Sequence, residues 1–213
     1  MIPRIIHQMW IGPKKAPMDM IQTWKDKNPG WKHIFWDETL LSKKYPNGFI
    51  NQRHIDDHET YNGKCDIMRY EILNDYGGFF IDADSICLNS LDDHFLAHDS
   101  FSCYESESLR GDLIATGYMG CVQHCKLMEC CISVLSNIND VSFAGTQKPS
   151  WVTVGPKFFT AVVSMFNYPI KVYPSYTFIP THFTGLKYNG NEKVYADQKW
   201  GSTLGYENIG IGY

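Results

Sequence analysis

The sequence predicts an α/β fold in which a single mixed, mostly parallel sheet is flanked by helices. Residues 3–11 are mainly apolar and strand-like, residues 18–27 combine apolar and charged positions at helical spacing, and residues 32–37 again have strand character. The order strand, helix, strand is typical of a βαβ unit, whose two strands run parallel. A chain of 213 residues is long enough for one domain with a complete core.

The same alternation continues along the chain. Apolar residues recur on one face of residues 63–76, Gly77-Gly78 provides a helix stop, and a short apolar strand follows at 79–82. Further strands are predicted at 86–88, opposite 79–82, and at 101–104, 118–122 and 170–173, and further helices at 124–137 and 156–166. We expect residues 1–213 to form one domain, with residues 181–213 as an irregular C-terminal segment that closes over the ligand site.

Composition excludes some functional classes. The net charge of −4 is opposite in sign to the basic surface of a nucleic-acid-binding protein. The N-terminus has no charged start followed by a long apolar run, and no apolar stretch reaches the roughly 18–20 residues that cross a bilayer. The seven cysteines are odd in number and irregularly spaced, which favours free thiols in a reducing compartment. From the sequence we therefore expect a cytoplasmic protein without a signal peptide or membrane span.

Two carboxylates follow the apolar strand at 79–82. Asp82 and Asp84 are one residue apart, so in an extended strand their side chains would point to the same side. Carboxylate oxygens are the ligands that Mn²⁺ and Mg²⁺ prefer, and such sites keep positions open for substrate phosphates. The pair predicts half of a metal site, although a solvated strand end or an Asx-turn would give the same local sequence.

Three further positions are candidates for ligand contacts. Asp66 and Arg69 share one face of a helix, either as a surface ion pair contributing at most about 1 kcal/mol or as contacts to sugar and phosphate oxygens. Trp10 stands at the end of the first strand, where ligands of open α/β sheets bind; it could stack on a base or fill the core. In the late polar segment, Gln198 and Ser202 carry neutral oxygen groups.

Together these positions fall in blocks whose order and spacing resemble glycosyltransferase family 32, the group with the DXD sugar-binding region. The blocks are residues 2–12, 65–73 and 76–84, and they also look like the catalytic domain of the large clostridial glucosylating toxins. Residues 154–156 and 200–202 resemble later blocks of the family. The resemblance covers most of the chain.

This resemblance implies a GT-A type nucleotide-sugar-binding fold, a nucleoside-diphosphate-sugar donor and a divalent metal, often Mn²⁺. It also implies roles for individual residues. Trp10 would stack on the donor base, and Asp66 and Arg69 would hold the donor sugar. Asp82 would contact the ribose and metal-bound water, and Asp84 would ligate the metal directly. The implied catalytic and metal-binding groups are therefore these four charged residues.

Three other positions match the family less closely. Phe80 would also face the donor, where relatives commonly have Tyr. Gln198 and Ser202 fall near the block in which the family often places another metal or phosphate ligand. The family commonly has a His pair where this chain has Gln198, and no second Trp follows Ser202 here. We expect Ser202 to contact the donor and either residue to complete the metal site.

The implied reaction is the metal-dependent transfer of a hexose from a nucleoside-diphosphate sugar to an acceptor hydroxyl, with retention at the anomeric carbon. The toxin-like blocks favour a UDP-hexose over GDP-mannose, and the acceptor is a glycan or a protein. Glu105 and Asp112 are candidate bases on the acceptor side. Two alternatives are a non-catalytic nucleotide-sugar or carbohydrate-binding module and a haloacid-dehalogenase-type phosphatase, whose nucleophile motif resembles residues 79–86.

Overall fold

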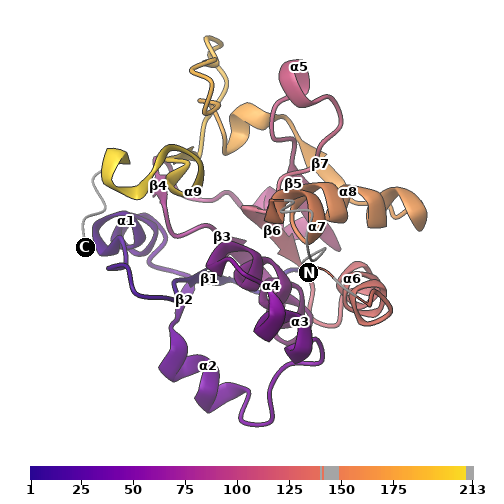
Figure 1. Cartoon of the computed structure of the whole chain (residues 1–213). Helices are drawn as coiled ribbons and strands as arrows, with labels where there is room; N and C mark the ends of the chain where they lie inside the picture. The colour runs from indigo at the N-terminus through magenta and orange to yellow at the C-terminus, as the bar shows by residue number, and fades with distance from the viewer. Residues whose placement is uncertain (140, 142–148, 210–213) are drawn as a thin grey trace.

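A six-stranded sheet forms the centre of the molecule (Figure 1). The computed structural model describes residues 1–139, 141 and 149–209. In these residues the sheet has the strand order β2-β1-β3-β6-β5-β7. Its strands are β1 (Ile5–Met9), β2 (Lys32–Trp36), β3 (Gly78–Ile81), β5 (Ser100–Cys103), β6 (Tyr118–Cys121) and β7 (Lys171–Tyr173).

The sheet is mixed. The pairs β1–β2, β1–β3 and β5–β7 are parallel, whereas β6 pairs antiparallel with both β3 and β5. Strands in a parallel pair run in the same direction, so a crossover segment that contains helices must connect them. The N-terminal strand-helix-strand order predicted such a connection. The predicted α/β class with a mostly parallel sheet is confirmed. β1 is shorter than predicted, spanning Ile5–Met9 instead of residues 3–11. β3 has the predicted length but lies one residue earlier, so it ends at Ile81, before the two aspartates.

Helices cover both faces of the sheet. The longer ones are α1 (Met18–Lys27), α4 (Tyr61–Tyr76), α6 (Lys126–Ser136) and α8 (Pro156–Met165), and the shorter ones are α2 (Glu38–Lys44), α3 (Gln52–Asp57), α5 (Glu107–Arg110), α7 (Ser150–Thr153) and α9 (Gly201–Leu204). Short 3-10 helices span Asp93–Ala97, Ser175–Thr177 and Tyr206–Ile209. No helix in the described part of the chain is both long and apolar enough to cross a membrane.

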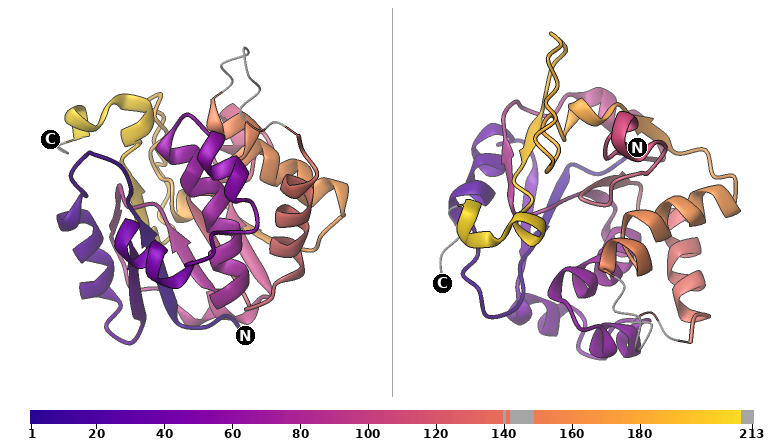
Figure 2. Two further views of the ribbon diagram at one scale, coloured as in Figure 1. Left: turned by 60° about the horizontal axis from the view of Figure 1, so that its bottom comes forward. Right: turned by 45° about the horizontal axis from the view of Figure 1, so that its top comes forward.

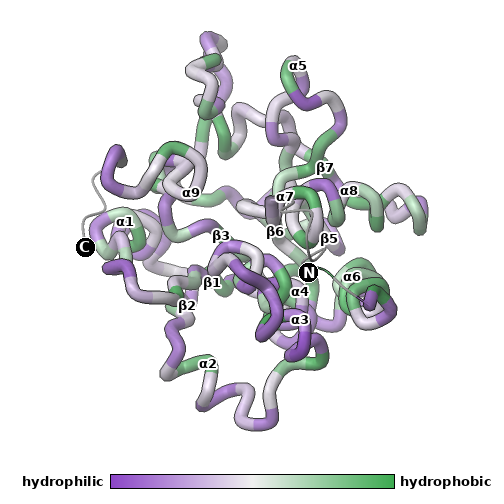
Figure 3. The backbone as a smooth tube through the Cα atoms, viewed as in Figure 1, coloured by the Kyte–Doolittle hydropathy of each residue, from purple (hydrophilic) through white to green (hydrophobic). Residues whose placement is uncertain are grey.

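Side-chain alternation along β3 divides the core into two parts. Phe80 joins the cluster that α4, α6 and α8 form on one face, while Phe79 and Ile81 join the cluster on the opposite face, which includes Trp24 of α1. α6 packs against both α4 and α8, as Figures 1 and 2 show, and Figure 3 shows how hydrophobic α6 is. β3 is therefore buried on both faces, which explains its uninterrupted apolar sequence.

α4 is the helix that leads into β3. Thr60 caps its N-terminus by accepting a hydrogen bond from the Gly63 N–H at 3.3 Å. Gly77 ends it at φ +61°, a conformation that favours glycine. A Cβ on Gly78 would stand 2.6 Å from the Ile5 carbonyl oxygen, so the Gly-Gly pair both stops the helix and lets β3 approach β1. The predicted helix at 63–76 is observed, beginning two residues earlier.

A second, two-stranded sheet brings the C-terminal segment to the strand end that carries the aspartates. β4 (Ser85–Cys87) pairs antiparallel with β8 (Ala196–Gln198), with Ser85 opposite Gln198. The predicted pairing of 86–88 with 79–82 is wrong: a turn at residues 83–84 directs the chain out of the central sheet. β8 and α9 also give part of residues 181–209 regular structure, where the sequence predicted an irregular segment.

Candidate active site

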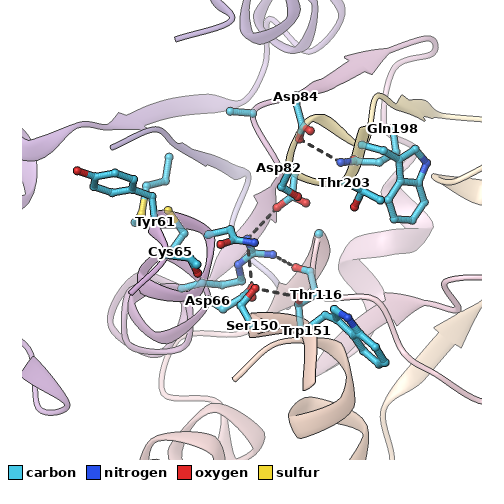
Figure 4. Close-up of a pocket in the computed structure, with 18 of the residues that line it drawn as sticks. Tyr61, Cys65, Asp66, Asp82, Asp84, Thr116, Ser150, Trp151, Gln198 and Thr203 are labelled. Atoms are coloured by element: carbon cyan, nitrogen blue, oxygen red, sulfur yellow. Dashed lines mark hydrogen bonds and ion pairs between the residues drawn. The ribbon is translucent and has the colours of Figure 1, made fainter. Parts of the chain in front are cut away.

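A cavity of about 540 Å³ opens beyond the carboxyl ends of β1 and β3. Such a position is where open α/β sheets bind ligands, because loops from neighbouring strands meet there. The cavity collects the residues that the sequence singled out, and Figure 4 shows several of them around it. Its lining includes Trp10 after β1, Asp66 and Arg69 of α4, Phe80, Asp82 and Asp84 at the end of β3, and Gln198 and Ser202 from the C-terminal segment.

Arg69 is the charged centre of this cavity. Its Nη2 donates a hydrogen bond to Asp82 Oδ1 at 2.8 Å and lies 3.6 Å from Asp66 Oδ1, and its Nη1 donates to the carbonyl oxygen of Thr116. The guanidinium carbon lies 4.8 Å from the centre of the Phe80 ring. Arg69 is only 4% exposed, so this ion pair is buried rather than the surface pair that the sequence left open.

Burial shifts the proton affinities of this cluster. Burial raises the pKa of Asp66 to about 6, even though the Arg69 charge opposes the shift. Burial alone would disfavour the Arg69 cation, but Asp82 and Asp66 together raise its pKa above the usual value. The Nε of Arg69 is buried and has no partner among the described residues. A buried donor without a partner is costly unless a ligand accepts its hydrogen bond. Such a donor beside a carboxylate with a raised pKa is typical of functional sites.

Asp84 is held by the C-terminal segment. Its Oδ1 accepts a hydrogen bond from Gln198 Nε2 at 3.0 Å, and its Oδ2 accepts one from the Gly201 N–H at 2.6 Å. Burial and the neighbouring Asp82 raise the pKa of Asp84 to about 6, while these two donors work against the shift. Trp200, next to Gly201, adopts the left-handed conformation at φ 60°, which is uncommon for a residue with a side chain.

The orientation of Gln198 is fixed from both ends. Its amide nitrogen bonds Asp84, and its Oε1 accepts a hydrogen bond from the Tyr118 hydroxyl at 2.9 Å. That hydroxyl also lies 2.9 Å from Ser85 Oγ. Gln198 therefore presents N–H rather than oxygen to Asp84 in this state. Ser202 is exposed and lines the cavity, so both predicted metal contacts lie near the carboxylates, and their ligand role stays a prediction.

Two glycines leave room for the carboxylates. A Cβ on Gly117 would stand 2.6 Å from Asp82 Oδ2, and one on Gly155 would stand 2.7 Å from Asp66 Oδ2. Thr116, beside Gly117, donates from its hydroxyl to Asp66 Oδ1 at 3.2 Å. Neither Thr116 nor Gly117 stands out from the sequence alone as a site residue. The small residues just before β6 were the only local signal, and nothing in them indicates which strand end they face.

Trp10 also lines the cavity. Its Nε1 donates to the Lys14 carbonyl oxygen at 2.7 Å, and Tyr206 contacts its ring edge-to-face with 5.2 Å between the ring centres. Trp10 is half-buried and lines the cavity, so it is not a core residue, which was one of the two roles that the sequence left open. Its expected stacking on a base stays a prediction.

The carboxylates fit a hard divalent cation that shares its ligands with a substrate. Among the residues that the structure describes, no three His, Cys, Asp or Glu side chains gather closely enough to hold a metal by themselves. Asp82 and Asp84 supply oxygen donors from one turn, and Mg²⁺-type sites often use one or two carboxylates with substrate phosphates and water completing the shell. The donor set therefore suits a cation bound together with a diphosphate.

Comparison with known proteins shows which proteins this chain resembles. Residues 14–102 match the family model described as "Glycosyltransferase sugar-binding region containing DXD motif". An uncharacterized glycosyltransferase of Acanthamoeba polyphaga mimivirus is 31% identical over 115 residues, which cover 51% of this chain and 46% of that protein. The mannosyl phosphorylinositol ceramide synthase SUR1 of Saccharomyces cerevisiae is 31% identical over 105 residues, 43% of this chain and 25% of the yeast protein. The matched region is thus less than half of each curated relative.

Solved structures match over more of the chain. The PaToxG glycosyltransferase superposes with a TM-score of 0.60 at 14% identity, covering 78% of this chain and 70% of that one. The catalytic domain of the alpha-toxin of Clostridium novyi gives 0.56 at 9% identity, covering 98% and 80%. These likenesses show a shared GT-A fold. The chain is thus similar to glycosyltransferases whose sugar-binding region contains the DXD motif, and the matched residues include Asp82-Ala83-Asp84.

Proposed function

We propose that this protein is a metal-dependent hexosyltransferase that moves a hexose from a nucleoside-diphosphate sugar to an acceptor hydroxyl. One observation carries the proposal. The cavity beyond β1 and β3 is lined by Trp10, by the buried Asp66, Arg69 and Asp84, and by the half-buried Asp82. Sugar hydroxyls, a diphosphate and a base are the three parts of such a donor, and each has a chemically suited partner here.

Asp66 and Arg69 are suited to the sugar end of the donor. A buried carboxylate whose pKa is raised gains from accepting hydroxyl hydrogen bonds, and Asp66 already accepts one from Thr116. Arg69 Nε is the buried donor without a partner in the described chain. Phe80 lies under the guanidinium and keeps its plane in place. The pair therefore offers one acceptor and one donor to the same ligand.

The reaction makes the diphosphate more negative as the bond to the anomeric carbon breaks. A divalent cation held by Asp82 and Asp84 would offset that charge by Lewis-acid stabilisation, without a proton transfer. Arg69 fixes Asp82 through one carboxylate oxygen, which leaves the other oxygen for the cation. The fixed guanidinium also supplies positive charge that needs no reorganisation during the reaction. Retention at the anomeric carbon follows from the family resemblance and belongs to this proposal.

We propose a UDP-hexose as the donor and Mn²⁺ or Mg²⁺ as the metal. A toxin domain of the same fold, named YGT, has been solved with UDP bound, at a TM-score of 0.52 and 10% identity. Several curated relatives are named as mannosyltransferases, which makes GDP-mannose the matched alternative. The net charge of −4 and the absence of a basic patch motif favour a small-molecule donor over a nucleic-acid partner.

A panel of UDP- and GDP-sugars tests the donor and the reaction together. Purified protein is incubated with each sugar in Mn²⁺, in Mg²⁺ or in EDTA, and the released nucleoside diphosphate is measured with and without glycan acceptors. We expect turnover with one UDP-hexose, dependent on metal. Nuclear magnetic resonance of the product would show the same anomeric configuration as the donor; an inverted product would refute retention.

A non-catalytic nucleotide-sugar-binding module is the second candidate. It is favoured by one observation: both oxygens of Asp84 are engaged by N–H donors, and Gln198 stands where the family commonly has His. Thermal shift with UDP or GDP plus Mn²⁺ distinguishes the two. Stabilisation by the nucleotide without turnover of any sugar would support the binding module and contradict the enzyme.

A further inference from the structure

A second cavity of about 320 Å³ lies beside the first one. One wall comes from α5 and the residues before it, and the other comes from residues 175–189, whose loop stands out from the body in Figures 1 and 2. Among the residues that the structure describes, Glu105 and Ile179 line both cavities. Glu105 therefore lies where the two cavities adjoin.

We propose that this second cavity binds the acceptor, that the acceptor is an uncharged sugar, and that Glu105 holds its reactive hydroxyl where the two cavities adjoin. The inference rests on the proposed transfer reaction. It assigns the acceptor class, which the family model does not specify and for which the names of several relatives give inositol phosphoceramide instead.

Glu105 is built to accept a hydroxyl. Its carboxylate is buried, and its Oε1 accepts a hydrogen bond from Arg110 Nε at 2.9 Å. Its Oε2 has no hydrogen-bond partner among the residues that the structure describes. The Arg110 guanidinium in turn lies over the Trp151 ring, with its carbon 4.4 Å from the ring centre, so the carboxylate is held from a fixed side. One oxygen is anchored and the other is left for a ligand.

The Nε2 atom of His182 is a second buried polar atom without a hydrogen-bond partner in the described part of the chain. Its Nδ1 accepts from the Thr184 N–H and lies 3.0 Å from Thr184 Oγ1, so the ring proton is on Nε2. That Nε2 is buried, has no hydrogen-bond partner in the described chain, and lies 3.6 Å from Glu105 Oε1. Burial lowers the pKa of His182, which keeps the ring neutral. A neutral N–H donor beside an anchored carboxylate matches a hydroxyl, which both donates and accepts.

The rest of the lining indicates a sugar rather than an anion or a lipid. The charged groups facing the cavity are Glu105, Glu107 and Lys187, which together disfavour a phosphate or an acidic peptide. Tyr176 and Tyr188 stack with 4.3 Å between ring centres and add aromatic surface to the wall. Hydrogen-bonding side chains beside aromatic rings suit a ligand with polar edges and apolar C–H faces.

Saturation-transfer-difference NMR tests the site directly. The probes are the methyl glycosides of glucose, galactose and mannose, each added to the full chain with saturating UDP and Mg²⁺. UDP occupies the first cavity and leaves the second one free. At least one glycoside should therefore still show a saturation-transfer signal in the presence of UDP. Glu105→Gln and Tyr188→Ala should each weaken glycoside binding about tenfold, and Tyr188→Ala, which lines only the second cavity, should leave the UDP signal unchanged. Phe166→Ala, an exposed aromatic that lines neither cavity, is the matched control.

Three results would overturn the inference: no glycoside signal, a signal that UDP removes, or a signal that both variants retain. If Glu105→Gln does not fold, the glycoside signal of Tyr188→Ala tests the inference by itself, because Tyr188 is half-exposed. Failure of the proposed function is distinguishable from failure of the acceptor site. If the proposed transfer is wrong, no nucleotide sugar is turned over, whether or not UDP binds, and a remaining glycoside signal would leave a sugar-binding site without an acceptor role.

Discussion

Replacing the buried carboxyl of Asp66 should make the free protein more stable and inactivate it. Burial raises the pKa of Asp66 from 3.8 to about 6. The folded protein thus holds this proton more tightly than the unfolded chain does. Its contribution to the free energy of unfolding is complete below pH 4 and is lost as the pH rises to about 6. A shift of about two pKa units corresponds to about 3 kcal/mol.

Asp66→Asn removes this penalty because the amide cannot ionise. Its oxygen can still accept the hydrogen bond from Thr116 Oγ1. We therefore expect the variant and the wild type to have similar free energies of unfolding at pH 4. Above pH 6 the variant should be more stable, by up to about 3 kcal/mol. Turnover of the nucleotide sugar should fall at least a hundredfold, since the sugar loses a charged acceptor.

Urea unfolding between pH 4 and pH 8, in EDTA to exclude metal binding, measures the effect. Asp57→Asn, an exposed aspartate at the end of α3, is the matched control and should show no such pH-dependent difference. A variant that is less stable than wild type at pH 8, or a difference that does not change with pH, would refute the assigned burial of this carboxyl. Retained turnover would refute its role in the donor site.

Three further substitutions probe the other parts of the site. Asp84→Asn should abolish the metal-dependent release of nucleoside diphosphate, and calorimetry should detect no Mn²⁺ binding to the variant. Wild-type turnover would contradict the metal assignment. Trp10→Ala should raise the donor KM about tenfold with little change in kcat, because stacking on a base contributes about 1–3 kcal/mol; an unchanged KM would remove Trp10 from the base site. Gly117→Ala places a Cβ 2.6 Å from Asp82 Oδ2 and should weaken Mn²⁺ binding with UDP about tenfold, whereas Gly30→Ala, where the Cβ meets nothing within 4 Å, should not. Equal Mn²⁺ affinities of these two glycine variants would show that Asp82 is not required.

The local sequence was sufficient to predict the helix and the strand that lead to the site. The helix at 61–76 and the apolar strand after it follow from side-chain periodicity and from Gly77-Gly78, and both are present. The alternation expected to align Asp82 with Asp84 does not apply, since the strand ends at Ile81. The two carboxylates nevertheless line the same cavity, because the turn at residues 83–84 brings them together.

The sequence by itself determined the α/β class, the two aspartates at a strand end, and the placement of Asp66 and Arg69 one helical turn apart. These features depend on residues within a few positions of one another. Only the tertiary structure decided what each carboxylate contacts. Asp84 is bonded by groups 114 and 117 residues away, and Arg69 by a carbonyl 47 residues away. Such partners depend on strand order and on the β4–β8 pairing, which local periodicity does not specify.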